Sequence, residues 1–159
     1  IMSKVTIKNF FEPQWGGGAI DGNVTSYRFP LATSANGGAK NATSAAPLAI
    51  GDVVDLGSLP AGMVLEDSQL IVTAPLTAAV TGSLGFAYAD GVDSADVPQD
   101  AAYFGSALVL SAAARLRNGV AKLVTLPKDA RLILTIAGAD NAKAAALVAI
   151  VHGERLGNP

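Results

Sequence analysis

The sequence predicts an all-β fold, a sandwich or barrel, and three observations support this prediction. Half of the residues are apolar and 15% are charged, so the 159-residue chain can bury a core as one ordinary domain. Its apolar segments are short, and most are spaced about ten to twenty residues apart. Turns rich in Gly, Pro, Asp and Asn separate them, a pattern that is typical of antiparallel sandwiches and barrels.

The first 47 residues differ in composition from the rest, so we expect an N-terminal arm, 1–47, followed by a β-sandwich domain, 48–159. Within the arm, 4–11 and 24–31 are candidates for short strands. The glycine-rich stretch 13–23 between them favours turns. Residues 32–47 are small and polar, which is typical of a linker or flexible loop.

The arm carries five aromatic residues but shows little periodicity, so it cannot bury their rings by itself. Either the arm packs on the main domain or it docks on a neighbouring molecule, and the sequence leaves both alternatives open. We therefore select the aromatic residues as candidate partner-contacting residues, with burial in the core as the alternative for each: Phe10, Phe11, Trp15, Tyr27 and Phe29.

The predicted strands of the main domain follow one another from Leu48 onward. In the best example, Leu132, Leu134 and Ile136 alternate with other residues and would share one buried face. The expected strands are 50–59, 63–74, 82–90, 103–112, 119–126, 130–138 and 143–154.

Two alanine-rich stretches, 106–117 and 140–153, are ambiguous because alanine is the best helix former. For the second we favour a strand, because 147–151 is rich in β-branched residues and follows a hairpin-like turn. For the first we expect a helical turn around 111–117.

One device occurs twice: an apolar run, Leu-Pro, a short step and a second apolar run. It appears as "LGSLPAGMVLEDSQLIV" (56–72) and as "LVTLPKDARLILTIAG" (123–138). Proline fixes φ and lacks the N–H that a β-ladder needs, so it suits a position where strand pairing ends. We interpret both as corners at which the chain leaves one sheet for the other; the alternative is that Leu-Pro simply terminates a strand.

Composition excludes several classes of partner and site. With a net charge of −2 and no Lys/Arg cluster, we expect no direct nucleic-acid binding. Without cysteine, disulfides and thiolate metal sites are impossible. No apolar run is long enough to span a bilayer and no signal peptide is visible, so we expect no membrane association.

No motif for catalysis stands out, so we predict that the chain is not an enzyme and has no catalytic, cofactor or metal site. His152 is the only histidine, and no G-x-S-x-G nucleophile elbow accompanies it. The glycines of 36–44 do not form a P-loop. The stretch Asp90–Asp100 holds four aspartates without EF-hand spacing, which favours a solvated loop; whether this loop binds a cation stays open.

The stretch "IGDVVDLGSLPAGMVLEDSQLIVTA" (50–74) resembles the capsid cement or decoration proteins of tailed bacteriophages, small virion proteins with a jelly-roll-like sandwich. A "GD-x-φ-x-L-G-x-LPAG" stretch, in which φ is apolar, commonly opens their main sheet. The resemblance covers about residues 48–155, including a final apolar strand at 145–151. The matching positions are Gly51, Asp52, Val54, Leu56, Gly57, Leu59, Pro60, Ala61 and Gly62.

The resemblance implies a jelly-roll-like β-sandwich with an extended N-terminal arm, and a binding role without catalysis. Such a protein would bind the outside of a bacteriophage capsid as a homo-oligomer, a dimer or trimer. It would stabilise contacts between capsomers of the major capsid protein. Its place would be the virion surface, assembled in the host cytoplasm. The alternatives are a head-fibre base or tail protein, a carbohydrate-binding β-sandwich and, least supported, an enzyme.

Overall fold

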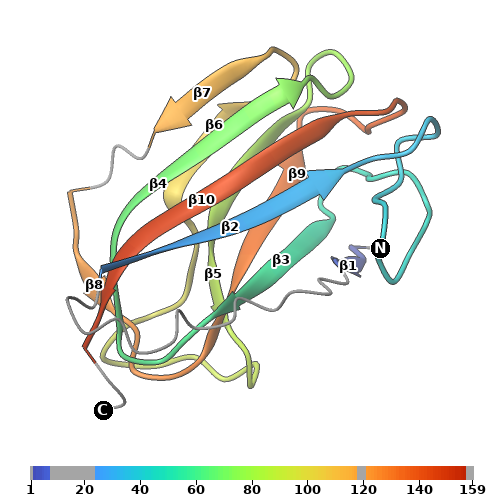
Figure 1. Ribbon diagram of the computed structural model, residues 1–159. Helices are drawn as coiled ribbons and strands as arrows, with labels where there is room; N and C mark the ends of the chain where they lie inside the picture. Colours follow the sequence, from blue (N-terminus) through green and yellow to red (C-terminus); the bar gives the residue numbers. More distant parts are fainter. Residues whose placement is uncertain (1, 8–23, 118–120, 157–159) are drawn as a thin grey trace.

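The computed structural model describes residues 2–7, 24–117 and 121–156. Within these ranges every element of regular secondary structure is a β-strand (Figure 1). They are β1 (Lys4–Thr6), β2 (Val24–Ala32), β3 (Val53–Leu59), β4 (Met63–Ala74), β5 (Thr81–Tyr88), β6 (Asp100–Val109), β7 (Ala114–Arg117), β8 (Val124–Thr125), β9 (Ala130–Ala137) and β10 (Ala146–Arg155).

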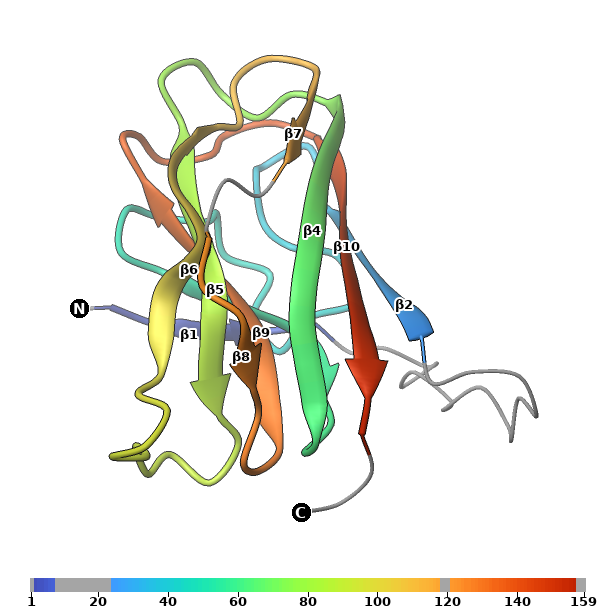
Figure 2. The same cartoon turned by 90° about the vertical axis from the view of Figure 1, so that its left-hand side faces the viewer.

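The strands form two sheets that pack face to face (Figures 1 and 2). One sheet has the order β1-β3-β9-β5-β6, and the other has the order β2-β10-β4-β7 with β8 also beside β4. Apart from β1 and β3, which are parallel, the paired strands are antiparallel. Without β1 and β8, the strands are distributed between the two sheets as in a jelly roll. The predicted all-β, jelly-roll-like sandwich is confirmed.

Strand β10 shows how the alternating pattern builds the core. Its residues alternate between buried and half-buried positions, and Leu147, Ala149 and Val151 face the opposite sheet. It pairs with β2 on one side and β4 on the other. The preference for a strand over a helix in this alanine-rich stretch is therefore confirmed, because two ladders satisfy its backbone groups.

The helical turn expected around 111–117 is wrong, because residues Ala114–Arg117 form β7. This strand pairs with Gln69–Val72 of β4, and Leu116 packs against the core while Arg115 and Arg117 are exposed. Pairing with a neighbouring strand overrides the weak helix preference of alanine.

Both Leu-Pro segments are corners between sheets, as predicted. At Pro60 the chain leaves β3 in one sheet and enters β4 in the other. At Pro127 it leaves β8, which pairs with β4, and enters β9 in the first sheet. Leu59 and Leu126, which precede the prolines, are fully buried.

The two corners lie side by side and are hydrogen-bonded to each other. The Gly62 N–H donates to the Leu126 carbonyl at 2.8 Å, and the Leu126 N–H donates to the Met63 carbonyl at 2.9 Å. The Ala61 N–H donates to Asp129 Oδ1 at 2.8 Å. We call this part of the sandwich the corner end.

The described parts of residues 1–47 belong to the sandwich itself. β1 extends one sheet beside β3, and β2 pairs with β10 along its whole length. The segment 33–47, expected to be a linker or flexible loop, connects these two edges through the backbone. The Lys40 N–H donates to the Ala32 carbonyl of β2, and the Thr43 N–H donates to the Thr6 carbonyl of β1.

Candidate interaction surfaces

The acidic side chains and the single histidine that the structure describes do not come together in a metal-binding group. Among residues 2–7, 24–117 and 121–156, no three His, Cys, Asp or Glu side chains are grouped as a metal site would require. Within the same ranges, no helix has the length and apolar character needed to cross a bilayer.

His152 lies on the outer face of its sheet, in register with Ser26 of β2 and Asp67 of β4. Burial alone would raise the pKa of Asp67. Hydrogen bonds from the Arg117 guanidinium and the Ser68 N–H outweigh burial and hold this pKa below its ordinary value. The carboxylate therefore stays ionised as the partner of an arginine.

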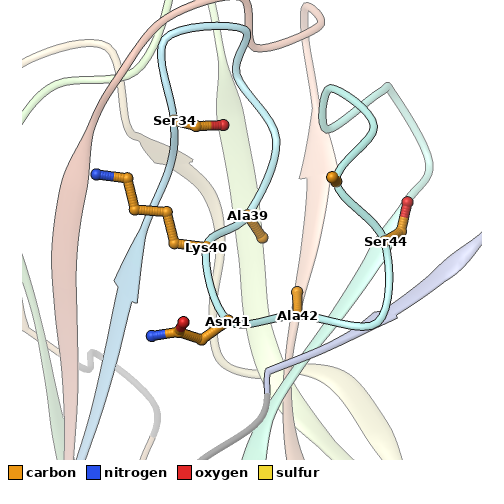
Figure 3. A pocket seen from close by; sticks show the side chains of 7 residues that line it. Ser34, Ala39, Lys40, Asn41, Ala42 and Ser44 are labelled. Atoms are coloured by element: carbon orange, nitrogen blue, oxygen red, sulfur yellow. The ribbon is translucent and has the colours of Figure 1, made fainter.

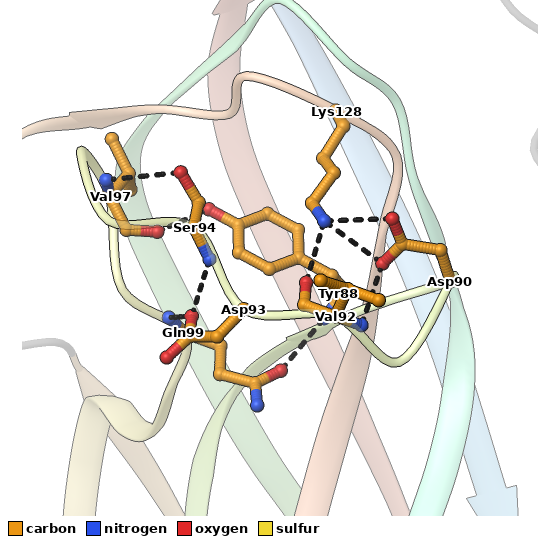
Figure 4. Close-up of polar contacts among 8 residues, drawn as sticks. All are labelled: Tyr88, Asp90, Val92, Asp93, Ser94, Val97, Gln99 and Lys128. Carbon is orange, nitrogen blue, oxygen red and sulfur yellow. Dashed lines mark hydrogen bonds and ion pairs between the residues drawn. The ribbon is translucent and has the colours of Figure 1, made fainter.

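The acidic loop between β5 and β6 is held by a lysine of the protein (Figure 4). Lys128 Nζ lies 2.7 and 3.0 Å from the two carboxylate oxygens of Asp90, and this hydrogen bond lowers the pKa of Asp90. The same ammonium group donates to the Val92 carbonyl at 2.6 Å and lies 4.6 Å from the centroid of the Tyr88 ring. One positive charge thus organises the start of the loop beside the corner at Pro127.

The remaining polar groups of this loop mostly bind its own backbone (Figure 4). Asp93 Oδ1 accepts hydrogen bonds from the N–H groups of Ser94 and Gln99, at 2.8 and 2.7 Å. The Tyr88 hydroxyl donates to the Val97 carbonyl, and burial raises the pKa of this tyrosine. The carboxylates at 90 and 93 therefore act as structural acceptors in the loop.

A shallow hollow of about 510 Å³ lies on the segment 33–47, which follows β2 and is hydrogen-bonded to β1 (Figure 3). Small side chains make up most of its lining, and Lys40 is its one charged residue. The Ser34 hydroxyl already bonds to Asn36 and to the Gly38 carbonyl. Such a lining offers room for a side chain of a partner. The lining residues are Ser34, Ala39, Lys40, Asn41, Ala42, Ser44 and Ala45.

Two of the five predicted partner-contacting residues are in the core. Tyr27 and Phe29 point inward from β2, are 5% and 1% exposed, and have ring centroids 6.4 Å apart. For these two the alternative of core burial holds, because they occupy the inward positions of a strand. Phe10, Phe11 and Trp15 lie outside the described residues.

Of the seven large apolar side chains that are exposed among the described residues, four lie around the corner end, and the sequence analysis did not identify them. Val24, Val92, Leu123 and Leu156 are 76%, 62%, 66% and 59% exposed. Each belongs to the ends of strands or to loops and not to an inward strand position, so alternation gives no signal for it. A possible signal was the large apolar residue beside a turn. We call these four residues the apolar rim.

Backbone contacts place the apolar rim at one end of the molecule. Val24 pairs with Glu154 near the end of β10, and the Leu156 N–H donates to the carbonyl of Gly62 in the first corner. Leu123 directly precedes β8, and Val92 lies in the acidic loop that Lys128 holds. Their common location at this end makes the apolar rim a candidate contact surface.

The sequence matches no family model and no curated protein. The structure, however, is similar to chains of solved phage capsids. One is in "Capsid of Ralstonia phage GP4", with a TM-score of 0.60, 19% identity, and coverage of 86% of this chain and 87% of that one. Another is in "Cyanophage Pam1 capsid asymmetric unit", with a TM-score of 0.54, 16% identity, and coverage of 84% and 86%. At these identities the likeness establishes a shared fold over most of each chain.

Proposed function

We propose that the chain is a structural virion protein that binds the outside of a bacteriophage capsid and stabilises contacts between capsomers of the major capsid protein. The observation that carries the proposal is the shared fold. It extends over 86% of this chain and 87% of a chain in the capsid of Ralstonia phage GP4. The "GD-x-φ-x-L-G-x-LPAG" stretch, which covers β3 and the corner that follows it, suggests a cement or decoration protein by resemblance.

The surface suits adhesion by contact area. The apolar rim offers large exposed side chains, and the polar groups of the neighbouring loop are engaged within the protein. Burial of such side chains against a partner would be favourable without any titrating group. Phe10, Phe11 and Trp15 remain proposed contacts in the arm. A homo-oligomer on the virion surface would present several copies of each contact and so strengthen binding.

A carbohydrate-binding role has no specific support in the described residues. Sugar-binding surfaces commonly use exposed aromatic rings, and here each described aromatic side chain is buried. These residues are Tyr27, Phe29, Phe86, Tyr88, Tyr103 and Phe104. A head-fibre or tail component would share the virion role but would not bind an intact capsid shell evenly.

The proposal is tested with capsids assembled without the protein. Purified chain is added, and bound chain is measured by co-sedimentation and located by electron microscopy. We expect saturable binding over the outer surface and release of DNA at a higher temperature than from bare capsids. Absence of binding, or binding confined to the tail or its vertex, would overturn the proposal.

Two variants separate the candidate contact surfaces. One replaces Phe10, Phe11 and Trp15 by serine, and the other replaces Val24, Leu123 and Leu156 of the apolar rim by serine. The control is Val109→Ser, which changes an exposed valine on β6, in a strand outside the apolar rim. We expect at least one of the two sets to weaken capsid binding tenfold or more, and the control to bind normally. A deletion of residues 1–31 would not test the arm by itself, because it also removes most of the core strand β2.

A further inference from the structure

Strand β1 binds along the edge of the first sheet, beside β3. We call this edge, residues 52–55, the seat of β1. Lys4, Val5 and Thr6 pair with Val53, Val54 and Asp55 of β3. Val5 is buried in the core, and the Ile7 that follows the strand is buried as well. The seat therefore accepts two apolar side chains in addition to the backbone of a short strand.

Two buried carboxylates give the seat its selectivity. Ser3 donates from its N–H and its hydroxyl to Asp52 Oδ1, at 3.1 and 2.7 Å. Lys4 Nζ lies 3.2 Å from Asp55 Oδ2. A strand with a hydroxyl and a cation in consecutive positions, followed by apolar residues at alternate positions, therefore matches this seat, as in the Ser-Lys-Val-Thr-Ile sequence at 3–7.

Both carboxylates are also held by groups outside β1. Asp52 Oδ2 accepts a hydrogen bond from the Ala49 N–H at 3.0 Å. Both oxygens of Asp55 accept from Arg131 Nε of β9, at 2.9 and 3.1 Å. These contacts keep the acceptors in place when β1 leaves, and the uncovered edge of β3 then offers unpaired backbone groups to an incoming strand.

The chain between β1 and β2, residues 8–23, has more residues than are needed to cover the length of β2. Ile7 bridges to Ala42, on the segment bonded to the Ala32 end of β2, whereas the chain re-enters the sandwich at Val24, the opposite end. A nine-residue strand is about 30 Å long. Residues 8–23 can span up to about 55 Å when extended. The chain length thus permits β1 to reach a neighbouring molecule.

We propose that β1 is exchanged between two copies of this chain, so that Lys4–Thr6 of one copy pairs with Val53–Asp55 of the other. A second copy is the occupant that the seat fits best, because its own residues 3–7 satisfy every contact of the seat. The exchange repeats contacts already formed within one chain, and strand exchange of this kind is a low-cost route to an oligomer. It requires no capsid and is independent of the proposed function.

The absence of cysteine from the chain allows a direct test. A Lys4→Cys variant and a Val53→Cys variant of different length are co-expressed, purified, oxidised and separated on a non-reducing gel. These two positions are register partners, so a disulfide between the two variants requires exchange. The control pairs Val53→Cys with Lys143→Cys, an exposed position that contributes only its carbonyl to neighbouring side chains.

We expect the register pair to give at least ten times more cross-linked heterodimer than the control pair. Because Lys4→Cys removes the contact with Asp55, the experiment is repeated with Val5→Cys and Val54→Cys, which leave Lys4 in place. Heterodimer in either register pair supports exchange. Two further variants carry both cysteines of a register pair in one chain. If neither register pair exceeds the control while these double variants form their disulfide within one chain, β1 stays with its own copy and the proposal is overturned.

Discussion

At the scale of single residues, Asn141 joins three segments of the chain that lie far apart in the sequence. Its side chain is fully buried, and its Oδ1 accepts hydrogen bonds from the N–H and the hydroxyl of Thr77. Its Nδ2 donates to the carbonyls of Gly37 and Lys143, at 3.1 and 3.0 Å. One amide therefore links three loops through several hydrogen bonds, and its Oδ1 is the acceptor for the Thr77 N–H.

We expect Asn141→Ala to lower the free energy of unfolding by about 1–3 kcal/mol, since it removes several hydrogen bonds at once and leaves the Thr77 N–H without its Oδ1 acceptor. Urea unfolding followed by circular dichroism measures the change. Lys143→Ala is the matched control, because only the carbonyl of Lys143 takes part and its exposed side chain should matter by less than about 0.5 kcal/mol. Equal effects of the two substitutions would contradict the assignment.

The glycine at 37 fits the same junction because a larger residue would collide there. Gly37 has φ +88°, and a Cβ atom would lie 1.9 Å from the Asn141 carbonyl oxygen. Gly91 has a similar φ of +73°, but a Cβ atom there would meet nothing within 4 Å. The two positions separate the cost of collision from the cost of the left-handed backbone.

We expect Gly91→Ala to lower the free energy of unfolding by about 1–2 kcal/mol, the cost of placing a Cβ in the left-handed region. Gly37→Ala should cost at least twice as much, because the backbone of the junction must also move. Thermal and urea unfolding of both variants provide the comparison. If both substitutions lower the free energy of unfolding by the same amount, the close approach at Gly37 does not contribute to stability.

The sequence could not indicate either residue, because nothing in "NGGAKNATS" or "GADNA" reveals that the two segments meet. Glycines and small polar residues usually indicate flexible loops, and 32–47 was interpreted in that way. Its order arises from backbone hydrogen bonds, such as Lys40 to Ala32, which leave no side-chain pattern. The prediction therefore failed where the structure depends on main-chain contacts between distant segments.

At the scale of elements, the attachment of β1 to the sheet is expected to depend on pH, because Ser3 is hydrogen-bonded to the carboxylate of Asp52. Burial alone would raise the pKa of Asp52, but hydrogen bonds from Ala49 and Ser3 outweigh burial and hold this pKa below its ordinary value of 3.8. A carboxyl group with a lowered pKa stabilises the fold above its unfolded-state pKa. That contribution is lost as the pH falls through the folded-state pKa.

Asp52→Asn should therefore reduce the free energy of unfolding at pH 7 by about 1–3 kcal/mol, and the difference from wild type should shrink as the pH is lowered below about 3.8. Urea unfolding at pH 7 and pH 3 measures both values. Asp96→Asn, on the exposed loop, controls for the loss of one negative charge. A difference that stays constant or grows on acidification would show that Asp52 does not anchor β1 through its charged form.

Other elements were predictable where their pattern is local. The strand expected at 63–74 matches β4 at both ends, because apolar alternation, the corner at Pro60 and Pro75 bound it. Residues Ala114–Arg117 were misassigned, because a short alanine-rich segment has no strand signal until β4 pairs with it. The corners themselves were predictable from Leu-Pro, but their mutual hydrogen bonds join residues too distant for a sequence pattern.

At the scale of the whole molecule, the boundary expected between residues 47 and 48 separates two paired strands of one sheet. Strand β2 precedes that boundary and contributes Tyr27, Phe29 and Leu31 to the core, while β10 follows it and pairs with β2. Removal of 1–47 would expose the flank of β10 and leave space where three large side chains had packed. The cost of one such deletion, about 2–5 kcal/mol, is already a large part of the stability of a small domain.

We therefore expect a fragment of residues 48–159 to lack a cooperative thermal transition. A fragment of residues 24–159, which keeps β2 and loses β1, should unfold cooperatively at a lower temperature than the full chain. Calorimetry and near-ultraviolet circular dichroism of the three proteins distinguish these states, because fixed aromatic packing gives a signal only in a well-ordered core. Cooperative unfolding of 48–159 would show that the sandwich folds without β2. In that case the first 47 residues would act as an arm added to a complete domain.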